Sequence, residues 1–217
     1  MLLEHLPALN QKRLVLASAS PRRKELLQQL GLKFEVIVSN FEETLSKESV
    51  TAAEYATATA THKALDVAQN LLAGHAHLVI GADTVVEYGG HILEKPEDAQ
   101  DALRVLSMLS GQLHHVHTGV ALVVPPYPDN ENASGEPAVR SFAVTTAVQF
   151  DDVSARTLQA YIESGEPFGK AGSYGIQGLA GSFVKSIEGC YFNVVGFPIH
   201  RFSKEVVSLI DEGLLPL

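Results

Sequence analysis

The chain has little cysteine, little positive charge and no long apolar segment. Its single cysteine, Cys190, excludes an intramolecular disulfide framework and a cysteine-rich zinc site, and we expect a packed thiol there. No apolar run approaches the ~20 residues that a membrane helix needs. The first ten residues include Glu4 and Pro7 and lack the basic start of a secretory leader. These absences predict a cytoplasmic protein that does not bind membranes.

Basic residues are outnumbered, with 16 Lys and Arg against 25 Asp and Glu, and the formal net charge is −9. A broad nucleic-acid surface needs a positive field, so the charge argues against it and we expect no binding to a nucleic acid polymer. A few clustered Arg and Lys side chains, helped by a metal ion, could still hold a small phosphate ligand. Otherwise the composition is ordinary, with 46% hydrophobic residues, and we treat residues 1–217 as a single folded domain.

The hydrophobic pattern alternates between strands and helices, which predicts an α/β fold. A strand at 13–17, a helix from Pro21 to Gly31 and a strand at 34–38 form a parallel crossover unit. Thr51 and Glu54 form a capping box that begins a long helix, ending near residue 73. The other expected elements are strands at 77–86, 116–124, 139–150 and 183–187 and helices at 97–109, 154–164 and 198–212. The inward face predicted for helix 97–109 consists of Ala99, Ala102, Leu103, Leu106 and Leu109. The segment 125–137, rich in proline, is expected to be a mobile loop.

The segment 18–23, Ser-Ala-Ser-Pro-Arg-Arg, lies at the predicted turn from the first strand to the first helix. Ser20 suits the N-cap, and Pro21 suits the first helical position. Free backbone N–H groups and the positive end of a helix favour anions, and two hydroxyls and two guanidiniums accompany them. The segment predicts a phosphate site; the alternative is an N-cap followed by solvated arginines.

Two charged residues sit among apolar neighbours. Asp83 interrupts a buried strand, where a carboxylate is costly unless it is paired or bound to metal. A carboxylate that caps a turn is the alternative. Lys63 shares a helix face with Ala60 and Val67, so its ammonium either reaches a cleft or snorkels to solvent.

Other polar residues carry weaker signals. Glu43 and Lys95 lie in predicted loops, where solvated side chains are the usual outcome. The segment 169–178 has four glycines, which allow close approach to a ligand, and its Gln177 offers a donor and an acceptor suited to a base edge; a plain turn is the alternative. The run 114–117 holds three histidines, but a metal site there has little support.

In their order along the chain, these segments resemble the Maf family of nucleoside triphosphate pyrophosphatases. The segments that match are 18–23, 40–44, 63–64, 81–84, 95–96, 117–119, 169–178 and 193–196. They span about residues 12 to 200, and their combination is far more specific than any single motif.

The resemblance implies an elongated, twisted, mixed β-sheet flanked by helices, with two lobes around a central cleft, and a homodimer. It implies hydrolysis of a nucleoside triphosphate to the monophosphate and pyrophosphate with a divalent metal, Mg²⁺ or Mn²⁺. The form Tyr-Gly-Ile-Gln-Gly at 174–178 resembles the subgroup that acts on dTTP and UTP. A sister subgroup that acts on 7-methyl-GTP has an acidic residue in place of Gln177.

By the same resemblance, Asp83 is the catalytic carboxylate and Glu43 its partner at the metal. The implied substrate-binding residues are Ser18, Ser20, Arg22, Arg23, Lys63, Thr84, Lys95, Lys170 and Gln177. The chain departs from the family pattern at Asn40, where an Asp is common. This departure favours one alternative, a non-enzymatic nucleotide-binding regulator of cell division. A pyrophosphatase for 7-methyl-GTP or for ITP and XTP is the other alternative that stays open.

Overall fold

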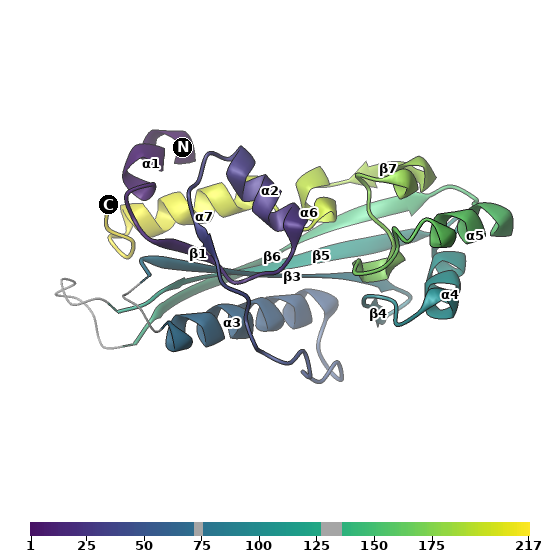
Figure 1. The fold of residues 1–217 in the computed structure, drawn as a ribbon, viewed down its shortest axis with the longest axis horizontal. Helices are drawn as coiled ribbons and strands as arrows, with labels where there is room; N and C mark the ends of the chain where they lie inside the picture. Colours follow the sequence, from purple (N-terminus) through teal and green to yellow (C-terminus); the bar gives the residue numbers. More distant parts are fainter. Residues whose placement is uncertain (72–75, 127–135) are drawn as a thin grey trace.

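The computed structural model describes residues 1–71, 76–126 and 136–217, which form a mixed β-sheet flanked by helices (Figure 1). The strands are β1 (Leu14–Leu16), β2 (Glu35–Val36), β3 (Leu78–Tyr88), β4 (His91–Leu93), β5 (Leu113–Val124), β6 (Ala138–Phe150) and β7 (Val184–Glu188). The helices are α1 (Leu2–Leu9), α2 (Pro21–Gln29), α3 (Ala52–Asn70), α4 (Ala99–Leu109), α5 (Ala155–Glu163), α6 (Tyr191–Val195) and α7 (Ile199–Asp211). Of two 3₁₀ turns, η1 (Ala171–Ser173) lies in the glycine-rich segment 169–178, and η2 (Leu179–Phe183) follows it.

The strand order in the described sheet is β2-β1-β3-β5-β6-β7, with β4 paired to β3. β1 is parallel to both β2 and β3, and the other pairs are antiparallel. The crossover from β1 through α2 to β2 confirms the predicted parallel unit. The sheet is mixed because long antiparallel strands follow this unit.

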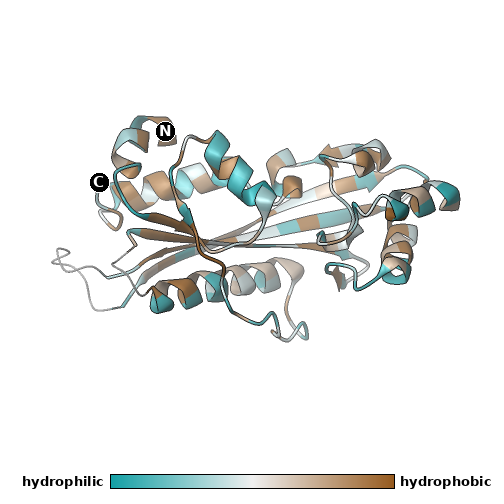
Figure 2. Cartoon of the chain, in the orientation of Figure 1, coloured by the Kyte–Doolittle hydropathy of each residue, from teal (hydrophilic) through white to brown (hydrophobic). Residues whose placement is uncertain are grey.

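The long strands β3, β5 and β6 run the length of the molecule and join two lobes (Figure 1). At one end, α1, α2 and α7 cover one face of the sheet and α3 covers the other. At the other end, α4 and α5 enclose a separate core around Leu106, Phe150 and Tyr161. Figure 2 shows the outer surface of α2 as hydrophilic, whereas the strands that cross beneath it are hydrophobic. The predicted α/β architecture with two lobes is confirmed.

Two glycines let α3 lie unusually close to the sheet. A Cβ atom on Gly81 would stand 2.2 Å from the carbonyl oxygen of Ala60, and one on Gly119 would stand 2.4 Å from that of Ala56. Ala56 and Ala60 are fully buried, so small side chains line both surfaces of this contact. The close packing brings the middle of α3 within side-chain reach of β3.

Most predicted elements are confirmed within one to three residues, and the capping box is present. Thr51 Oγ1 accepts from the Glu54 N–H at 3.2 Å, and the Glu54 carboxylate accepts from the Thr51 N–H at 2.8 Å. The inward position predicted for Ala99 is wrong, because Ala99 is exposed at the start of α4 and Val105 is buried in its place. Leu103 is only half-buried.

Some predictions reach residues outside the described part of the chain. α3 ends at Asn70, and its expected end near residue 73 lies beyond the described range. Most of the expected 125–137 loop also lies outside that range. The elements α1, β4 and α6 were not predicted from the sequence: β4 and α6 are too short to show a hydrophobic period, and α1 contains Pro7, which disfavours a helix interior. Of the described helices, none combines the length and the apolar character that crossing a membrane requires.

Candidate functional site

A cavity of about 660 Å³ opens between the two lobes and collects residues that are far apart in the sequence. Its lining includes all eleven of the predicted site residues, namely Ser18, Ser20, Arg22, Arg23, Glu43, Lys63, Asp83, Thr84, Lys95, Lys170 and Gln177. Asn40 and Glu42 do not line it. The roles of these eleven residues stay predictions, but their common location follows from the fold.

The centre of the cavity is an ammonium group held between two carboxylates. Lys63 Nζ of α3 lies 2.8 Å from Asp83 Oδ1 of β3 and 2.8 Å from Glu43 Oε1 of the loop after β2. Lys95 Nζ lies 3.9 Å from the same Glu43 oxygen. The Lys63 and Asp83 side chains are 12% and 8% exposed, whereas Glu43 is 35% exposed. Lys63 therefore points into the cleft rather than snorkelling to solvent.

The two carboxylates differ in their affinity for protons. Burial raises the pKa of Asp83, and the positive charges of Lys63 and Arg23 offset this only in part. Burial would also raise the pKa of Glu43, but the Lys63 hydrogen bond and the charges of Lys63, Lys95 and Arg23 lower it below its ordinary value. Asp83 is consequently the stronger base of the pair, which is how neighbouring carboxylates divide acid and base roles.

The carboxylate pair suits a hard divalent ion that also binds a phosphate ligand. Mg²⁺ is typically held by one or two carboxylates, with water and substrate oxygens as its other ligands. Asp83 and Glu43 each use one oxygen for Lys63, and the second oxygen of each accepts none of the hydrogen bonds between described residues. Within the described ranges, no group of three or more His, Cys, Asp and Glu side chains is placed to hold a metal. The two free carboxylate oxygens therefore fit a divalent ion that also takes phosphate oxygens as ligands.

The three histidines at 114–117 on β5 each contact another described side chain. His115 Nδ1 lies 3.4 Å from the carboxylate of Glu87, and His117 Nδ1 is hydrogen-bonded to Thr145 Oγ1 at 2.9 Å. His114 is buried and hydrogen-bonded to the Tyr174 hydroxyl at 2.8 Å. His115 and His117 lie on one face of the sheet, with ring centroids 6.2 Å apart, and His114 lies on the other.

Arg23 lines the cavity, but its guanidinium is committed to the protein. Nη1 donates to Ser18 Oγ, Nη2 to Thr84 Oγ1 and Nε to the Gly196 carbonyl, each at 3.0 Å. Burial lowers the pKa of Arg23, and the charge of Asp83 opposes that effect. These contacts join the start of α2, the middle of β3 and the loop after α6. Arg23 thus holds the walls of the cavity together.

Arg22 and the start of α2 are less committed. Arg22 Nε donates to the Val195 carbonyl at 3.3 Å, and its other guanidinium nitrogens make none of the hydrogen bonds among described residues. Ser20 occupies the N-cap of α2, as predicted, but its hydroxyl does not cap the helix. The first backbone N–H groups of α2 therefore keep their capacity to bind an anion.

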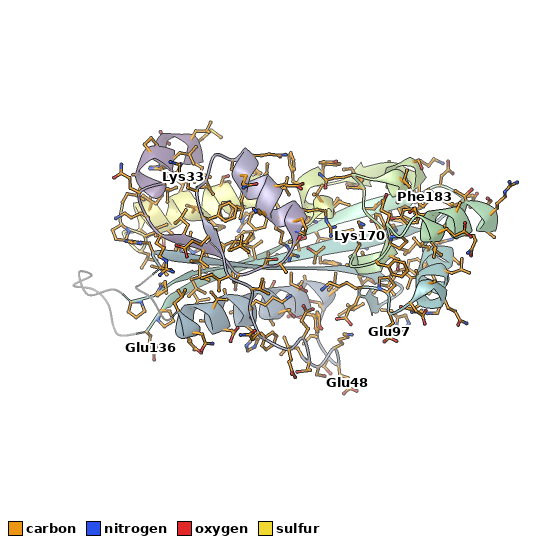
Figure 3. The ribbon with its side chains drawn as sticks, in the orientation of Figure 1. Lys33, Glu48, Glu97, Glu136, Lys170 and Phe183 are labelled. Atoms are coloured by element: carbon orange, nitrogen blue, oxygen red, sulfur yellow. The ribbon has the colours of Figure 1, made fainter. Side chains whose placement is uncertain are left out.

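The remaining predicted residues differ in whether their polar groups already have hydrogen-bond partners in the protein. Thr84 Oγ1 accepts from Arg23 and lies 3.0 Å from Thr118 Oγ1, so this hydroxyl is occupied. Lys170 lies above the long strands in Figure 3 and donates to the Glu166 carbonyl, and burial lowers its pKa. Gln177 is exposed at the cavity wall and makes no side-chain hydrogen bond among the described residues.

Several residues around the cavity carried no chemical signal in the sequence. Val195 and Gly196 contribute only carbonyl oxygens, which any residue supplies. Phe41 lines the cavity and stacks on His62 of α3, with ring centroids 4.9 Å apart. Phe41 belongs to the segment 40–44 that carries the family resemblance, so the sequence could have drawn attention to it. Its contact with α3 follows only from the fold.

Comparison with known proteins finds close relatives along nearly the whole chain. The family model described as "Maf-like protein" matches residues 13–209. The chain is 46% identical over 204 residues to the dTTP/UTP pyrophosphatase of Alkaliphilus oremlandii, covering 94% of this chain and all of that protein. It is 42% identical over 197 residues to the dTTP/UTP pyrophosphatase of Bacillus cereus, covering 91% and 90% of the two chains.

A human relative is longer. The chain is 50% identical over 202 residues to the probable bifunctional dTTP/UTP pyrophosphatase/methyltransferase protein of Homo sapiens. The match covers 91% of this chain but 32% of the human protein. The part shared with the human protein therefore has about the same length as the segment that the family model matches.

Proposed function

This chain belongs to the Maf-like protein family, and from that premise we propose that it hydrolyses nucleoside triphosphates, above all dTTP and UTP, to the monophosphate and pyrophosphate. The observation that carries the proposal is one cavity that combines the Lys63-bridged carboxylate pair with the uncapped start of α2. Phosphoryl chemistry depends mainly on positioning and on neutralising charge, and these two parts supply both.

The triphosphate binds, in this proposal, between the start of α2 and the Lys95 side of the cavity. The uncapped N–H groups of α2 and the terminal nitrogens of Arg22 donate to phosphate oxygens. Lys63 and Lys95 add positive charge, and Lys95 is 60% exposed and so able to follow the departing pyrophosphate. Ser18 and Arg23 act indirectly, because they hold each other and the wall of the cavity.

Asp83 is the base in this proposal. Its raised pKa makes it a better proton acceptor than an ordinary Asp, and Lys63 holds the carboxylate at 2.8 Å. Asp83 takes a proton from the water that attacks the α-phosphorus in line with the leaving oxygen. A divalent ion held by Asp83 and Glu43, Mg²⁺ or Mn²⁺, would neutralise phosphate charge and lower the pKa of bound water.

Gln177 is the proposed reader of the base. An amide offers one donor and one acceptor, which complement the N3–H and O4 edge that thymine and uracil share. Gln177 makes no side-chain hydrogen bond among the described residues, so its amide is available. The names of the relatives support the same choice of substrates.

Two alternative functions differ from this proposal in substrate preference or in turnover. A pyrophosphatase for ITP and XTP, or for 7-methyl-GTP, prefers a purine. A nucleotide-binding regulator of cell division binds triphosphates without turnover. This alternative was favoured by Asn40, which stands where the family commonly has an Asp. Asn40 is exposed and outside the cavity lining, and its backbone N–H only anchors the loop to Asp66, so the structure gives that alternative no support.

A nucleotide panel tests the proposal. Each common triphosphate, with ITP, XTP and 7-methyl-GTP, is incubated with Mg²⁺ and inorganic pyrophosphatase, and released phosphate is measured with malachite green. We expect dTTP and UTP to be hydrolysed fastest and EDTA to abolish turnover. A purine preference would replace the substrate assignment, and no phosphate from any triphosphate would remove the enzymatic function.

We also propose that the protein is a cytoplasmic homodimer, as the family resemblance implies. Size-exclusion chromatography with light scattering tests the assembly. A mass twice that of one chain supports the dimer, and the mass of one chain contradicts it.

A further inference from the structure

Glu94 lies just outside the cavity lining, immediately before Lys95, and joins three segments that carry site residues. We propose that Glu94, through a clasp with Lys47 and Tyr55, is a positioning residue that holds the Glu43 loop over the cavity. The inference deepens the proposed hydrolase function and rests on it for its effect on turnover. None of the three clasp residues lines the cavity, so the clasp acts through the residues that it positions.

The contacts of Glu94 reach in three directions. Its Oε1 accepts a hydrogen bond from the hydroxyl of Tyr55 in α3 at 3.0 Å. Its Oε2 is paired with Lys47 Nζ, whose ammonium also lies 5.8 Å from the centroid of the Tyr55 ring. Its carbonyl oxygen accepts from the Gly172 N–H at 3.0 Å. Glu94 therefore connects α3, the loop after β2 and the glycine-rich segment.

The loop that carries Glu43 is irregular from residue 39 to residue 50, so its position depends on side-chain anchors. Its first half is fixed to α3: Asp66 accepts from Ser39 Oγ at 2.7 Å and from the Asn40 N–H at 2.8 Å. Its second half is fixed by Lys47 to Glu94. Glu43 lies between the two anchors, where its own pairing with Lys63 and the packing of Leu45 beside Tyr55 also hold the loop. Loss of the Lys47 contact removes the ion pair that holds the second half.

The exposure of the clasp separates a positioning role from a role in global stability. The side chains of Lys47 and Glu94 are 44% and 38% exposed. An ion pair this exposed contributes little to the free energy of unfolding, because solvent and salt screen it. Its loss should therefore appear as local opening of the loop rather than as unfolding of the chain.

The test measures loop order and turnover in the full-length protein. Variants Glu94→Gln, Lys47→Met and their double combination remove the ion pair, and Tyr55→Phe removes the hydrogen bond and keeps the ring. Glu48→Gln and Glu97→Gln serve as matched controls, because both glutamates flank the clasp in sequence and lie at the periphery in Figure 3. Amide hydrogen exchange of residues 39–50 is followed without nucleotide, and dTTP hydrolysis gives kcat and KM.

We expect exchange in residues 39–50 to rise about threefold to fivefold in either single variant. We expect kcat to fall by a similar factor, with KM within about twofold and thermal unfolding nearly unchanged. The double variant should be no worse than the worse single variant, because both break the same contact. The two control variants should match the wild type.

Two results would overturn the inference. Unchanged exchange in residues 39–50 means that the clasp does not order the loop, and raised exchange with unchanged kcat means that loop order does not matter for turnover. If the wild-type protein hydrolyses no triphosphate, the proposed function fails, whereas the exchange result still decides whether the clasp orders the loop. If Tyr55→Phe unfolds because Tyr55 is buried, the exposed Lys47→Met variant carries the test.

Discussion

The two walls of the cavity use polar side chains in opposite ways. On the sheet wall, Arg23, Thr84 and Ser18 bond to one another, and Asp83 is held by Lys63. On the loop wall, Lys95 and Gln177 are exposed and make few contacts with the protein. The sheet wall is preorganised and suits chemistry that needs fixed positions, whereas the loop wall keeps its donors for a ligand. A residue's presence at a cavity therefore does not by itself make it a ligand-binding residue.

Asp83→Asn tests the sheet wall with the largest expected effect. The substitution preserves shape but removes the proposed base and leaves Lys63 ion-paired with Glu43 alone. We expect turnover of dTTP to fall on the order of 10²-fold or more, with the fold retained. The measurement is steady-state hydrolysis with Mg²⁺ together with circular dichroism.

Glu87→Gln is the matched control for Asp83→Asn, because Glu87 is on the same face of β3 but pairs with His115 outside the cavity lining. It should hydrolyse dTTP at the wild-type rate. Near-normal activity of Asp83→Asn would remove Asp83 as the base.

The two adjacent arginines allow a direct comparison between positioning and binding. Arg23→Lys loses a guanidinium with three protein acceptors, and we expect the free energy of unfolding to fall by about 2–3 kcal/mol. Arg22→Lys loses one protein hydrogen bond, and we expect stability within about 1 kcal/mol of the wild type and a KM for dTTP raised about tenfold. Urea unfolding and steady-state kinetics measure both. If the two substitutions changed the free energy of unfolding equally and the KM for dTTP equally, the distinction between a positioning Arg23 and a binding Arg22 would be contradicted.

Gln177→Glu tests the loop wall. The carboxylate cannot donate to O4 of thymine, so we expect kcat/KM for dTTP relative to 7-methyl-GTP to fall about tenfold. Stability should not change, because Gln177 is exposed and makes no side-chain hydrogen bond in the described chain. The nucleotide panel measures the ratio, and an unchanged ratio would remove Gln177 from substrate choice.

A surface arginine provides the smallest effect and a contrast to Arg23. Arg140 of β6 donates to Ser208 and Glu212 at the end of α7, and this contact is exposed. The Arg140 and Ser208 hydrogen bonds lower the pKa of Glu212 to about 2. Because the pKa of Glu212 is lower in the folded than in the unfolded protein, its ionised form stabilises the fold at pH values above the unfolded-state pKa. That stabilisation is lost as the pH falls from about 4.5 to about 2.

Between pH 5 and pH 3, the free energy of unfolding should therefore fall slightly less in Arg140→Gln than in the wild type. Unfolding free energies of both proteins at the two pH values measure the difference. A larger acid sensitivity in the variant would contradict the assignment.

The sequence predicted the parts of the site that depend on local pattern. The small-residue face of α3 put Lys63 on the side of the sheet but left open whether its ammonium reaches the cleft or solvent, and a carboxylate in a buried strand required a partner or a metal. What local pattern cannot provide is the meeting of distant segments. Two of the three acceptors of Arg23 lie 61 and 173 residues away in the chain, and only the fold shows that its donors are occupied. Short elements such as β4 and α6 escaped prediction because three to five residues carry no hydrophobic period.

Hydrolysis of dTTP in water enriched in ¹⁸O tests the central claim most directly. If water attacks the α-phosphorus, as the proposed site requires, mass spectrometry will find the label in dTMP and not in pyrophosphate. Label in pyrophosphate, or release of single phosphate groups from dTTP, would contradict the account.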